Sequence, residues 1–381
     1  MARKSDKASS TPDIDAQLEI QPAGTGDLES IQGVLDELRQ PVKVKRAKPA
    51  PPLERYKRST TEIWLNLFAA KDPDKSHTIE LADNLPLFFY GRHQPDPSIK
   101  AIEREFVHLK NNYKIAILPA LLKEPGEASD PHAKGDWRRR FPGEREELVL
   151  EVAKYLASQT PMSLDGDLGV PFTIAEIQRI LASANHSMRH EQIKEALWTL
   201  NLCKFIVTDL AGKNVIGESP IKSLGMSERG FKTVGLLQLS SFHTKAVKKG
   251  EYRGLNFPVA IGYQSILARC LHKHIGHYHL NADEQHPFKY TASAIMSLAG
   301  FSLEDKPSKW LKRIDVALTE MQASGYVREF SASPLKEGGK VKDYLYTIRL
   351  SQKFINEIII ANGRQRRIKG QLEYGLPMVE E

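Results

Sequence analysis

Between residues 305 and 330, apolar and polar side chains alternate with a helical period. One side of this stretch is apolar and predicts a buried face: Trp310, Leu311, Ile314, Ala317, Leu318 and Met321. The other side carries Lys309, Lys312, Arg313, Val316 and Thr319. Ser308 is placed to cap the start of the helix, and Gly325 to end it. The pattern predicts an amphipathic helix with a basic exposed side.

A hairpin is expected directly after this helix. Tyr326 to Phe330 is rich in strand formers, Gly338-Gly339 suits a turn, and Tyr344 to Leu350 alternates like a half-buried strand. The lysines around the turn are Lys336, Lys340 and Lys342. A basic helix followed by a basic-tipped hairpin is typical of a winged helix, in which the helix lies in a DNA major groove and the wing contacts phosphates.

The same order of elements occurs earlier in the chain. A shift of 121 positions places one set of apolar residues (Ile193, Ala196, Leu197, Leu200, Phe205 and Ile206) under Ile314, Ala317, Leu318, Met321, Tyr326 and Val327. A Pro-Phe pair precedes a short helical pattern in each copy, at Pro171 and at Pro287. A further amphipathic helix comes before it, at Glu144 to Ser158 and at Gly262 to Gly276. We therefore expect an α+β fold with two tandem winged-helix domains.

The whole chain divides into six expected parts. In order they are a largely disordered tail with one short amphipathic helix (1–55), an extension with a β-hairpin (56–140), winged helix 1 (141–241), a linker (242–256), winged helix 2 (257–362) and a basic and acidic tail (363–381). Winged helix 2 is expected to be the main DNA-recognition domain. Winged helix 1 is expected to serve as scaffold and dimer contact, with a secondary DNA contact.

The extension contains three local signals. Two alternating runs flank Asn111-Asn112 and predict a hairpin from Arg104 to Leu118 that adds a sheet to winged helix 1. Leu65 to Phe68 resembles the Leu-x-Leu-Phe end of the peptide that bacterial replication proteins insert into the sliding clamp, although a plain amphipathic helix explains the run equally well. Lys123 to Pro142 is expected to be a loop that holds the cluster Trp137 to Arg140.

The third helix of winged helix 1 has a mixed exposed face. Its expected members are Met188, Glu191, Lys194, Glu195 and Trp198, and its first turn offers Ser187, Arg189 and His190 to phosphates or base edges. Strands are expected at Phe205–Leu210, Val215–Met226 and Phe231–Leu239. In the linker, Lys248 and Lys249 are expected to follow the DNA backbone, and a last helix is expected at Ser351–Asn362.

Composition restricts the classes of function. The chain has 381 residues with 54 basic and 47 acidic side chains, a net charge of +7, and its basic residues occur in clusters. Such clusters indicate polyanion binding or simply solvated surface. The two cysteines, Cys203 and Cys270, lie in amphipathic patterns typical of reduced core residues in a cytoplasmic protein. The longest apolar run, Ile115 to Leu122, is too short to span a membrane, and no signal peptide is expected.

Motifs for enzyme chemistry are sparse. The sequence has no phosphate-binding Gly-x-x-x-x-Gly-Lys-Ser/Thr loop and no Cys-x-x-Cys pair. Four histidines cluster at His272, His274, His277 and His279, and His277-Tyr278-His279 matches the His-hydrophobe-His metal site of rolling-circle nickases. Imidazoles near a helix C-terminus also complement the helix dipole. We expect no catalytic, metal or cofactor site, with a metal-dependent nickase as the enzyme alternative.

Two stretches resemble iteron-binding plasmid replication initiators of the TrfA type. They are Glu146 to Ala153 with Phe172-Thr173-Ile174, and the run from Lys309-Trp310-Leu311-Lys312-Arg313 to Ser324-Gly325-Tyr326-Val327. The resemblance covers roughly 141–350. It implies a protein that binds direct repeats at an origin, helps to open an adjacent A·T-rich segment, recruits the host initiator and the replicative helicase, and exists as a homodimer in equilibrium with monomer.

The resemblance also implies roles for single residues. Lys309, Lys312, Arg313 and Val316 would contact bases, and Ser308 with the three wing lysines would contact phosphate. A winged-helix transcriptional repressor fits the same residues and stays open as an alternative.

Overall fold

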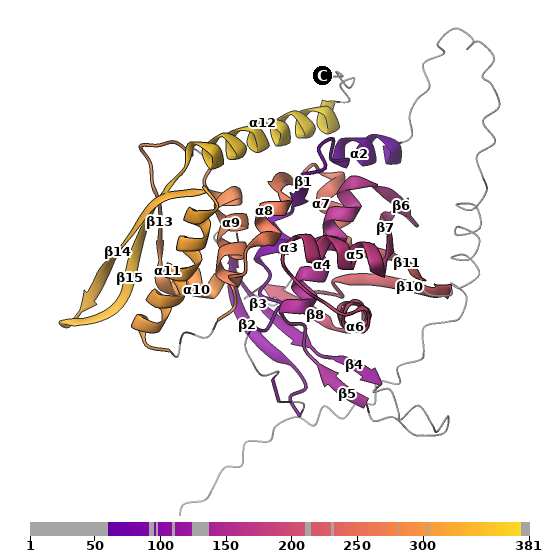
Figure 1. The fold of residues 1–381 in the computed structure, drawn as a ribbon, viewed down its shortest axis with the longest axis horizontal. Coiled ribbons are helices and arrows are strands. Elements are labelled where there is room, and N and C mark those ends of the chain that lie inside the picture. The colour runs from indigo at the N-terminus through magenta and orange to yellow at the C-terminus, as the bar shows by residue number, and fades with distance from the viewer. Residues whose placement is uncertain are drawn as a thin grey trace, which may run out of the picture. The chain divides into compact units, whose positions relative to one another are not determined.

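The computed structural model describes residues 60–90, 95–96, 98–108, 111–123, 137–209, 215–229, 232–280, 282–301, 303 and 305–374 (Figure 1). Contacts divide the chain after Ala50, and every described element belongs to the unit that begins at Pro51. The expected tail at 1–55, with its short helix and its basic clusters, lies outside the described residues. Within them, helices and antiparallel sheets occur together, which confirms the α+β class, and no helix is long and apolar enough to cross a membrane.

Winged helix 2 has the expected order of elements. They are α8 (Phe257–Gly262), α9 (Ile266–Tyr278), β13 (Phe288–Thr291), α10 (Ala292–Leu298), α11 (Pro307–Ala323), β14 (Val327–Glu337) and β15 (Lys340–Leu350). The strands form an antiparallel sheet in the order β13-β15-β14. The apolar side of α11 packs into the core through Trp310, Ile314 and Leu318, as its period predicts. The β14–β15 hairpin is the wing.

Winged helix 1 repeats this order with an insertion. Its elements are α4 (Glu144–Gln159), β6 (Met162–Leu164), β7 (Asp167–Thr173), α5 (Ile174–Ser183), α6 (His190–Leu202), β8 (Lys204–Asp209), β9 (Val215–Glu218), β10 (Ile221–Arg229) and β11 (Lys232–Leu239). The sheet has the order β10-β11-β7-β6, so the β10–β11 hairpin takes the place that β14–β15 has in winged helix 2. Strands β8 and β9 are inserted before it.

Two expectations for these strands are wrong. The sequence repeat aligns Phe205 and Ile206 with the first strand of the wing, but β8 pairs with a strand of the extension instead. The strand expected at Val215–Met226 is divided into β9 and β10 on either side of Ser219-Pro220. Pro220 has no N–H to donate to a sheet ladder, which disfavours one continuous strand at this point.

The extension supplies α2 (Thr60–Phe68), β1 (Lys75–Thr78), α3 (Glu80–Asn84), β2 (Ile102–His108), β3 (Asn111–Leu118), β4 (Ala120–Lys123) and β5 (Trp137–Arg140). The expected hairpin is confirmed, because β2 pairs with β3, and β3 pairs with β8 to extend winged helix 1. His108 pairs with Asn111, so both asparagines belong to β3 rather than to the turn. The segment expected to be a loop from Lys123 contains β5, which pairs with β4.

The expected linker is folded. Residues 241–256 form α7 (Ser241–Lys248) and β12 (Arg253–Asn256), and β12 pairs antiparallel with β1. Val247, Tyr252 and Leu255 are buried. These apolar side chains lie among the lysines that suggested a linker, and their burial decides the structure.

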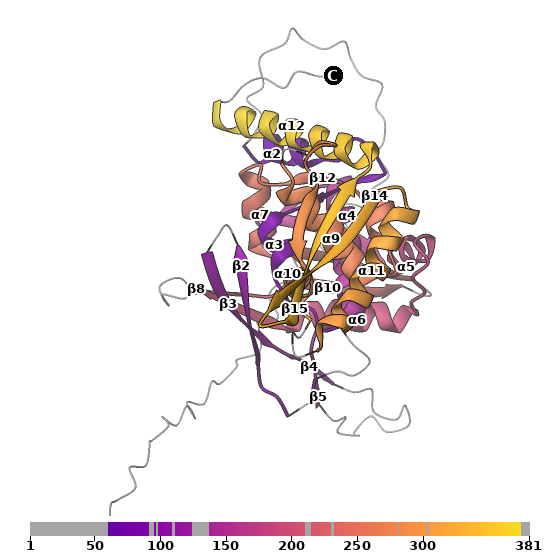
Figure 2. The same cartoon turned by 90° about the vertical axis from the view of Figure 1, so that its left-hand side faces the viewer.

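The last helix is longer than expected. Helix α12 runs from Gln352 to Tyr374, past Asn362-Gly363, where the sequence suggests an end (Figure 2). Its first half packs into the core of winged helix 2 through Phe354 and Ile358, and its second half packs into the core of winged helix 1 through Ile368. Burial of Ile368 stabilises the helix beyond the glycine, so residues 363–374 of the expected tail are helical.

Candidate nucleic-acid interface

Helix α11 has well-defined ends and is fixed by hydrogen bonds to the neighbouring loop and to the wing. Pro307 occupies its first turn, where a missing N–H costs nothing, and Gly325 follows its end with φ +76°. The carboxylate of Glu320 accepts hydrogen bonds from the backbone N–H groups of Gln264 (2.6 Å) and Ser265 (2.9 Å). On the wing side, the Tyr346 hydroxyl donates to Asp315 at 2.8 Å. The expectation that Ser308 caps the helix is wrong, because Lys306 is the N-cap residue and no side chain bonds there.

The exposed side of α11 is basic, as expected. Ser308, Lys309, Lys312, Arg313 and Val316 are all exposed, with Val316 at 64%. An open groove of about 690 Å³ runs beside this side and is lined by Lys312, Arg313 and Val316. The structure therefore brings these five residues together on one surface.

Asp305 already holds two of these cations. Its carboxylate lies 2.9 Å from Lys309 Nζ and 3.6 Å from Arg313 Nη1, and the hydrogen bond from Lys309 lowers the pKa of the Asp305 carboxyl. The Arg313 guanidinium also lies 5.2 Å from the centre of the Phe301 ring. Lys312 has no ion-pair partner within the described part of the chain. A DNA phosphate or base edge would therefore compete with Asp305 for Lys309 and Arg313, but not for Lys312.

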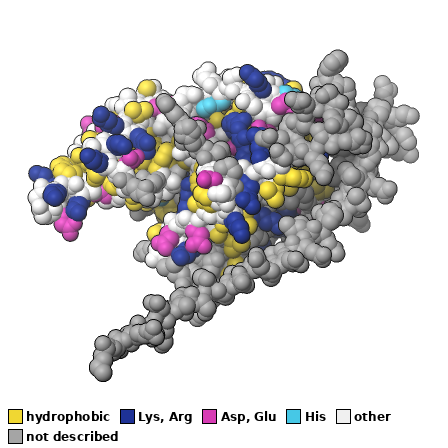
Figure 3. All heavy atoms as spheres, turned by 90° about the horizontal axis from the view of Figure 1, so that it is seen from below, with side chains coloured by type: hydrophobic (Ala, Val, Ile, Leu, Met, Phe, Trp, Pro, Cys, Tyr) yellow, Lys and Arg dark blue, Asp and Glu magenta, His cyan; other side chains and the backbone are white. Residues whose placement is uncertain are grey.

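The wing presents three exposed lysines. Strands β14 and β15 have 11 residues each, and they turn at Gly338-Gly339, both with positive φ. Lys336, Lys340 and Lys342 are exposed, and none has a partner among the residues that the structure describes. Figure 3 shows Lys and Arg side chains interspersed with hydrophobic and acidic ones at the end of the molecule where the wing lies. The arrangement suits contact with phosphates on both sides of a groove.

In winged helix 1 the expected face is largely neutralised. Lys194 Nζ lies 2.7 Å from Glu228 and 3.5 Å from Glu191. The Glu195 carboxylate lies 2.6 Å from Arg140 Nη1 and also forms an ion pair with Arg138. Two arginines of the basic cluster on β5 are therefore already paired with an acidic residue. Ser187 and Arg189 are exposed just before α6, as expected. Met188 is buried, which corrects the expectation that it faces solvent.

Lys248 and Lys249 do not extend the surface of α11. They stand at the end of α7, where Lys248 Nζ donates to the carbonyl of Gly166 at 2.7 Å and lies 5.5 Å from the centre of the Trp64 ring. Figure 2 shows α7 on one side of the molecule and α11, α5 and α6 on the other. The sequence predicts that these lysines belong to the DNA-binding surface, whereas the fold places their helix away from α11.

The four histidines do not converge. His272 packs among Tyr263, Tyr326 and Phe354, while His274 packs against Tyr278 and Tyr290. His277 Nε2 lies 3.2 Å from Asp83. Burial lowers the pKa of His272 and of His274 to about 3 each. Among the described residues, no three His, Cys, Asp or Glu side chains are placed to bind one metal ion. Within the described part of the chain, the four histidines thus do not form the metal site of the nickase alternative.

The possible sliding-clamp peptide is part of the fold. Trp64, Leu67 and Phe68 of α2 are buried in the core of winged helix 1. Arg364 of α12 donates to the carbonyls of Leu67 (3.4 Å) and Ala69 (3.1 Å) at the end of α2. The amphipathic-helix interpretation describes this stretch, and a clamp contact would require α2 to leave its site.

No family model and no curated protein matches this chain. Among solved structures, it is similar to two crystal structures of domains 2 and 3 of RctB, with TM-scores of 0.48 and 0.42 and sequence identities of 8% and 9%; each match covers 74% of this chain and 99% of that one. It is also similar to the Pi initiator protein in complex with iteron DNA, with a TM-score of 0.39, 12% identity and coverage of 55% and 91%. At these low TM-scores, the functional conclusion rests on the site itself.

Proposed function

We propose that this chain binds double-stranded DNA in a sequence-specific manner through α11 and the wing of winged helix 2. The observation that carries this proposal is the exposed basic side of α11, which leads directly into a long hairpin with three unpartnered lysines in the described chain. A helix of about 10–12 Å diameter fits a major groove about 12 Å wide. The function is binding rather than catalysis.

Each side chain has a role in this proposal. Lys312 and Arg313 are suited to the O6 and N7 acceptors of guanine, and Val316 is suited to the methyl group of thymine. Lys309 joins them at the groove, while Ser308 and the wing lysines bind phosphate and fix the register. Ser187 and Arg189 supply a secondary contact from winged helix 1. Lys194 is engaged by two carboxylates and would need to exchange them for phosphate.

We further propose that the bound DNA is a set of direct repeats at a replication origin. The resemblance of residues 309–327 and 146–153 to iteron-binding plasmid initiators supports this role. In this role as a replication initiator, the protein acts in the bacterial cytoplasm, promotes opening of an A·T-rich segment, and recruits the host initiator and the replicative helicase. Winged helix 1 pairs with a second copy in the homodimer, which is in equilibrium with the DNA-binding monomer.

A binding titration tests both parts of the proposal. The full chain is titrated against the DNA that flanks its own gene, with excess random competitor and at physiological salt, because phosphate contacts make affinity depend on salt. We expect stepwise mobility shifts on a fragment that contains several direct repeats. A single shift over the promoter alone would favour the repressor and contradict the replication role. Binding no tighter than to competitor would contradict sequence-specific recognition.

A further inference from the structure

Charged side chains line α4 of winged helix 1 and α9 of winged helix 2. On α4, Glu144, Glu147 and Glu151 follow each other at intervals of three and four residues, which places them on one face. On α9, Arg269 and Lys273 are four residues apart, also on one face. These faces meet between the two winged helices, and α3 of the extension adds Asp83 to the same cluster, which we name the α4–α9 network.

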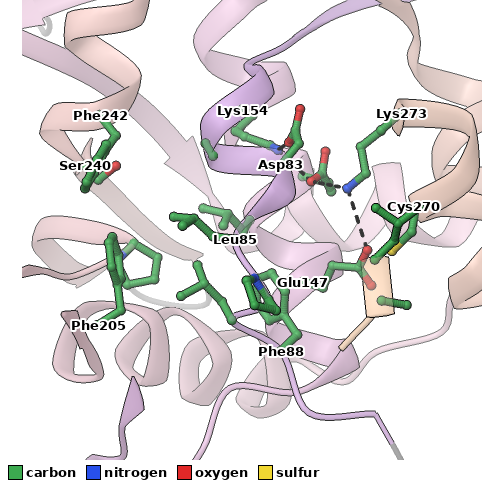
Figure 4. A pocket seen from close by; sticks show the side chains of 18 of the residues that line it. Asp83, Leu85, Phe88, Glu147, Lys154, Phe205, Ser240, Phe242, Cys270 and Lys273 are labelled. Carbon is green, nitrogen blue, oxygen red and sulfur yellow. Dashed lines mark hydrogen bonds and ion pairs between the residues drawn. The ribbon is translucent and has the colours of Figure 1, made fainter. Parts of the chain in front are cut away.

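The contacts form a continuous chain of ion pairs. Arg269 Nη2 lies 2.9 Å from Glu144 and 3.0 Å from Glu147, and Lys273 Nζ lies 3.1 Å from Glu151. Lys154 joins Glu151 (2.6 Å) to Asp83 (2.7 Å), and His277 Nε2 lies 3.2 Å from the same Asp83 carboxylate. Figure 4 shows Lys154 beside Asp83, and Lys273 reaching from α9 towards Glu147.

Most of the network is buried. The side chains of Arg269, Glu147 and Asp83 are only 1–2% exposed. Burial alone would raise the pKa of Asp83, but Lys154 and its other partners lower it overall. Burial alone would lower the pKa of Lys273, yet Glu151 and its other partners raise it. Asp83 and Lys273 therefore stay charged at neutral pH, and each depends on its partners for solvation.

Such a network specifies geometry more than it adds stability. Two apolar faces tolerate sliding, whereas a buried carboxylate that leaves its cation loses its only solvation. Relative rotation of α4 and α9 would separate several such pairs at once. The relative orientation of the two winged helices is thus restricted by directional contacts.

The network also ends at the DNA-facing surface. Glu144, its most exposed member at 45%, lines the same groove as Lys312, Arg313 and Val316. Next to it, the Gln264 side chain donates to the carbonyl of Ala184, just after the end of α5, while the Gln264 backbone N–H donates to Glu320 of α11. Gln264 of winged helix 2 therefore joins the end of α5 in winged helix 1 to α11 beside this end of the network.

We propose that the α4–α9 network sets the spacing along DNA at which both winged helices can make contact at the same time. The inference rests on the proposed function, because spacing has meaning only for a chain that binds DNA through both winged helices. Its buried members are positioning residues, because they touch each other and not the DNA. Specificity for the distance between two contacted segments would then come from Arg269, Lys273 and their carboxylate partners.

A spacing series on DNA tests the inference. Selection from a random duplex library gives the preferred target, and footprinting marks the segments protected by each winged helix. One, two or five base pairs are then inserted between these segments. Each inserted pair rotates them by about 34–36° and shifts them by about 3.4 Å, so we expect one pair to weaken binding of the parent protein by about tenfold.

The variant is Lys273→Met with Glu151→Gln, which removes one cation and one anion together and avoids an unpaired buried charge. We expect it to bind the preferred target within about threefold of the parent and to lose less than about threefold per inserted pair. The matched control is Lys222→Met with Asp167→Asn, a surface ion pair within winged helix 1. The control should lose affinity with each inserted base pair as strongly as the parent does.

The outcomes separate the inference from the proposed function. If each inserted base pair weakens binding by the parent and by the Lys273/Glu151 variant to the same large extent, the inference is wrong and the proposed function stands. If selection yields no target, the proposed function is wrong. The network is then tested without DNA, by spin labels at residues 191 on α6 and 319 on α11. An equally narrow distance distribution in parent and variant would overturn the positioning role.

Discussion

At the scale of single residues, the side chains proposed to face DNA differ in what already engages them. Lys309 and Arg313 share the carboxylate of Asp305, and Lys194 shares two glutamates. Lys312 and Lys342 have no partner in the described chain. Binding by an engaged cation must offset the loss of its partner, whereas a free cation gains the whole interaction. Free lysines are therefore the most informative positions to change.

Lys312→Ala and Lys342→Ala should have different effects on DNA binding. We expect Lys312→Ala to weaken binding to the preferred target by ~1–3 kcal/mol and to relax specificity, because Lys312 is proposed to contact base edges. Lys342→Ala should weaken binding to target and random DNA alike and reduce its salt dependence, because Lys342 is proposed to contact phosphate. Titrations on both DNAs at several salt concentrations measure this. Equal loss on random DNA for both variants would remove Lys312 from base recognition.

Buried histidines should make the fold labile to mild acid. Burial lowers the pKa of His77, His272 and His274 to about 3 and that of His243 to about 4. The unfolded chain protonates these groups near pH 6.5 and the folded chain does not, so stability is lost as the pH falls from about 6.5 towards these values. Each group costs roughly 1.4 kcal/mol per pH unit in that window.

Urea denaturation between pH 7.5 and 5 measures this loss. His272→Phe, which keeps a ring among Tyr263, Tyr326 and Phe354, should reduce the slope by the contribution of one histidine. His286→Phe is the matched control, because that side chain is 75% exposed. An unchanged slope in His272→Phe would show that His272 is protonated in the folded protein.

At the scale of elements, two glycines show how the same residue type ends one helix and continues in another. Gly325 follows α11 with φ +76°, a conformation that costs other residues strain. Gly363 lies inside α12, and a Cβ there would meet nothing within 4 Å. Local sequence cannot separate these cases, because glycine after a helical run usually marks an end.

Alanine should therefore change stability in opposite directions at the two positions. We expect Gly325→Ala to lower the free energy of unfolding by about 1–2 kcal/mol, because alanine is strained at positive φ. Gly363→Ala should raise it by about 0.5–1 kcal/mol, because alanine favours a helix interior. Denaturant titration at one pH compares both with the parent. A loss of stability in Gly363→Ala would mean that α12 ends at Asn362, as the sequence suggests.

At the scale of the whole molecule, α12 and the α4–α9 network join parts that the sequence treats as separate. Helix α12 contributes to the cores of both winged helices, and Gly250 after α7 allows Ile368 to approach closely: a Cβ on Gly250 would lie 2.8 Å from Ile368 Cγ2. The network joins the same two domains through charge. The two winged helices are thus linked by an apolar contact and by ion pairs.

Ile368→Ala tests the apolar link. Ile368 is 4% exposed in the core of winged helix 1, so its truncation should cost about 2–5 kcal/mol in stability. The matched control on the same helix is Ile360→Ala, which is 68% exposed and should change stability by less than about 0.5 kcal/mol. Denaturant unfolding compares the two. Equal, small effects would mean that residues after Asn362 form a tail apart from the core.

The sequence by itself determined the parts of this protein that depend on neighbouring residues. The apolar period from Trp310 to Met321 specifies the buried side of α11, and the glycines at 325, 338 and 339 specify its end and the turn of the wing. The basic side of α11 follows from the same period, because residues that are not buried must face solvent. The α+β class and the repeated order of elements follow from such local patterns.

Only the tertiary structure decided which distant segments meet. It pairs β8 with β3 and β12 with β1, continues α12 past Gly363, and buries Arg269 and Lys273 against the carboxylates of α4. Charged residues at helical spacing look like a solvated face in sequence, since nothing local distinguishes water from a distant carboxylate as their partner. Long-range burial makes that distinction, and it depends on the whole fold.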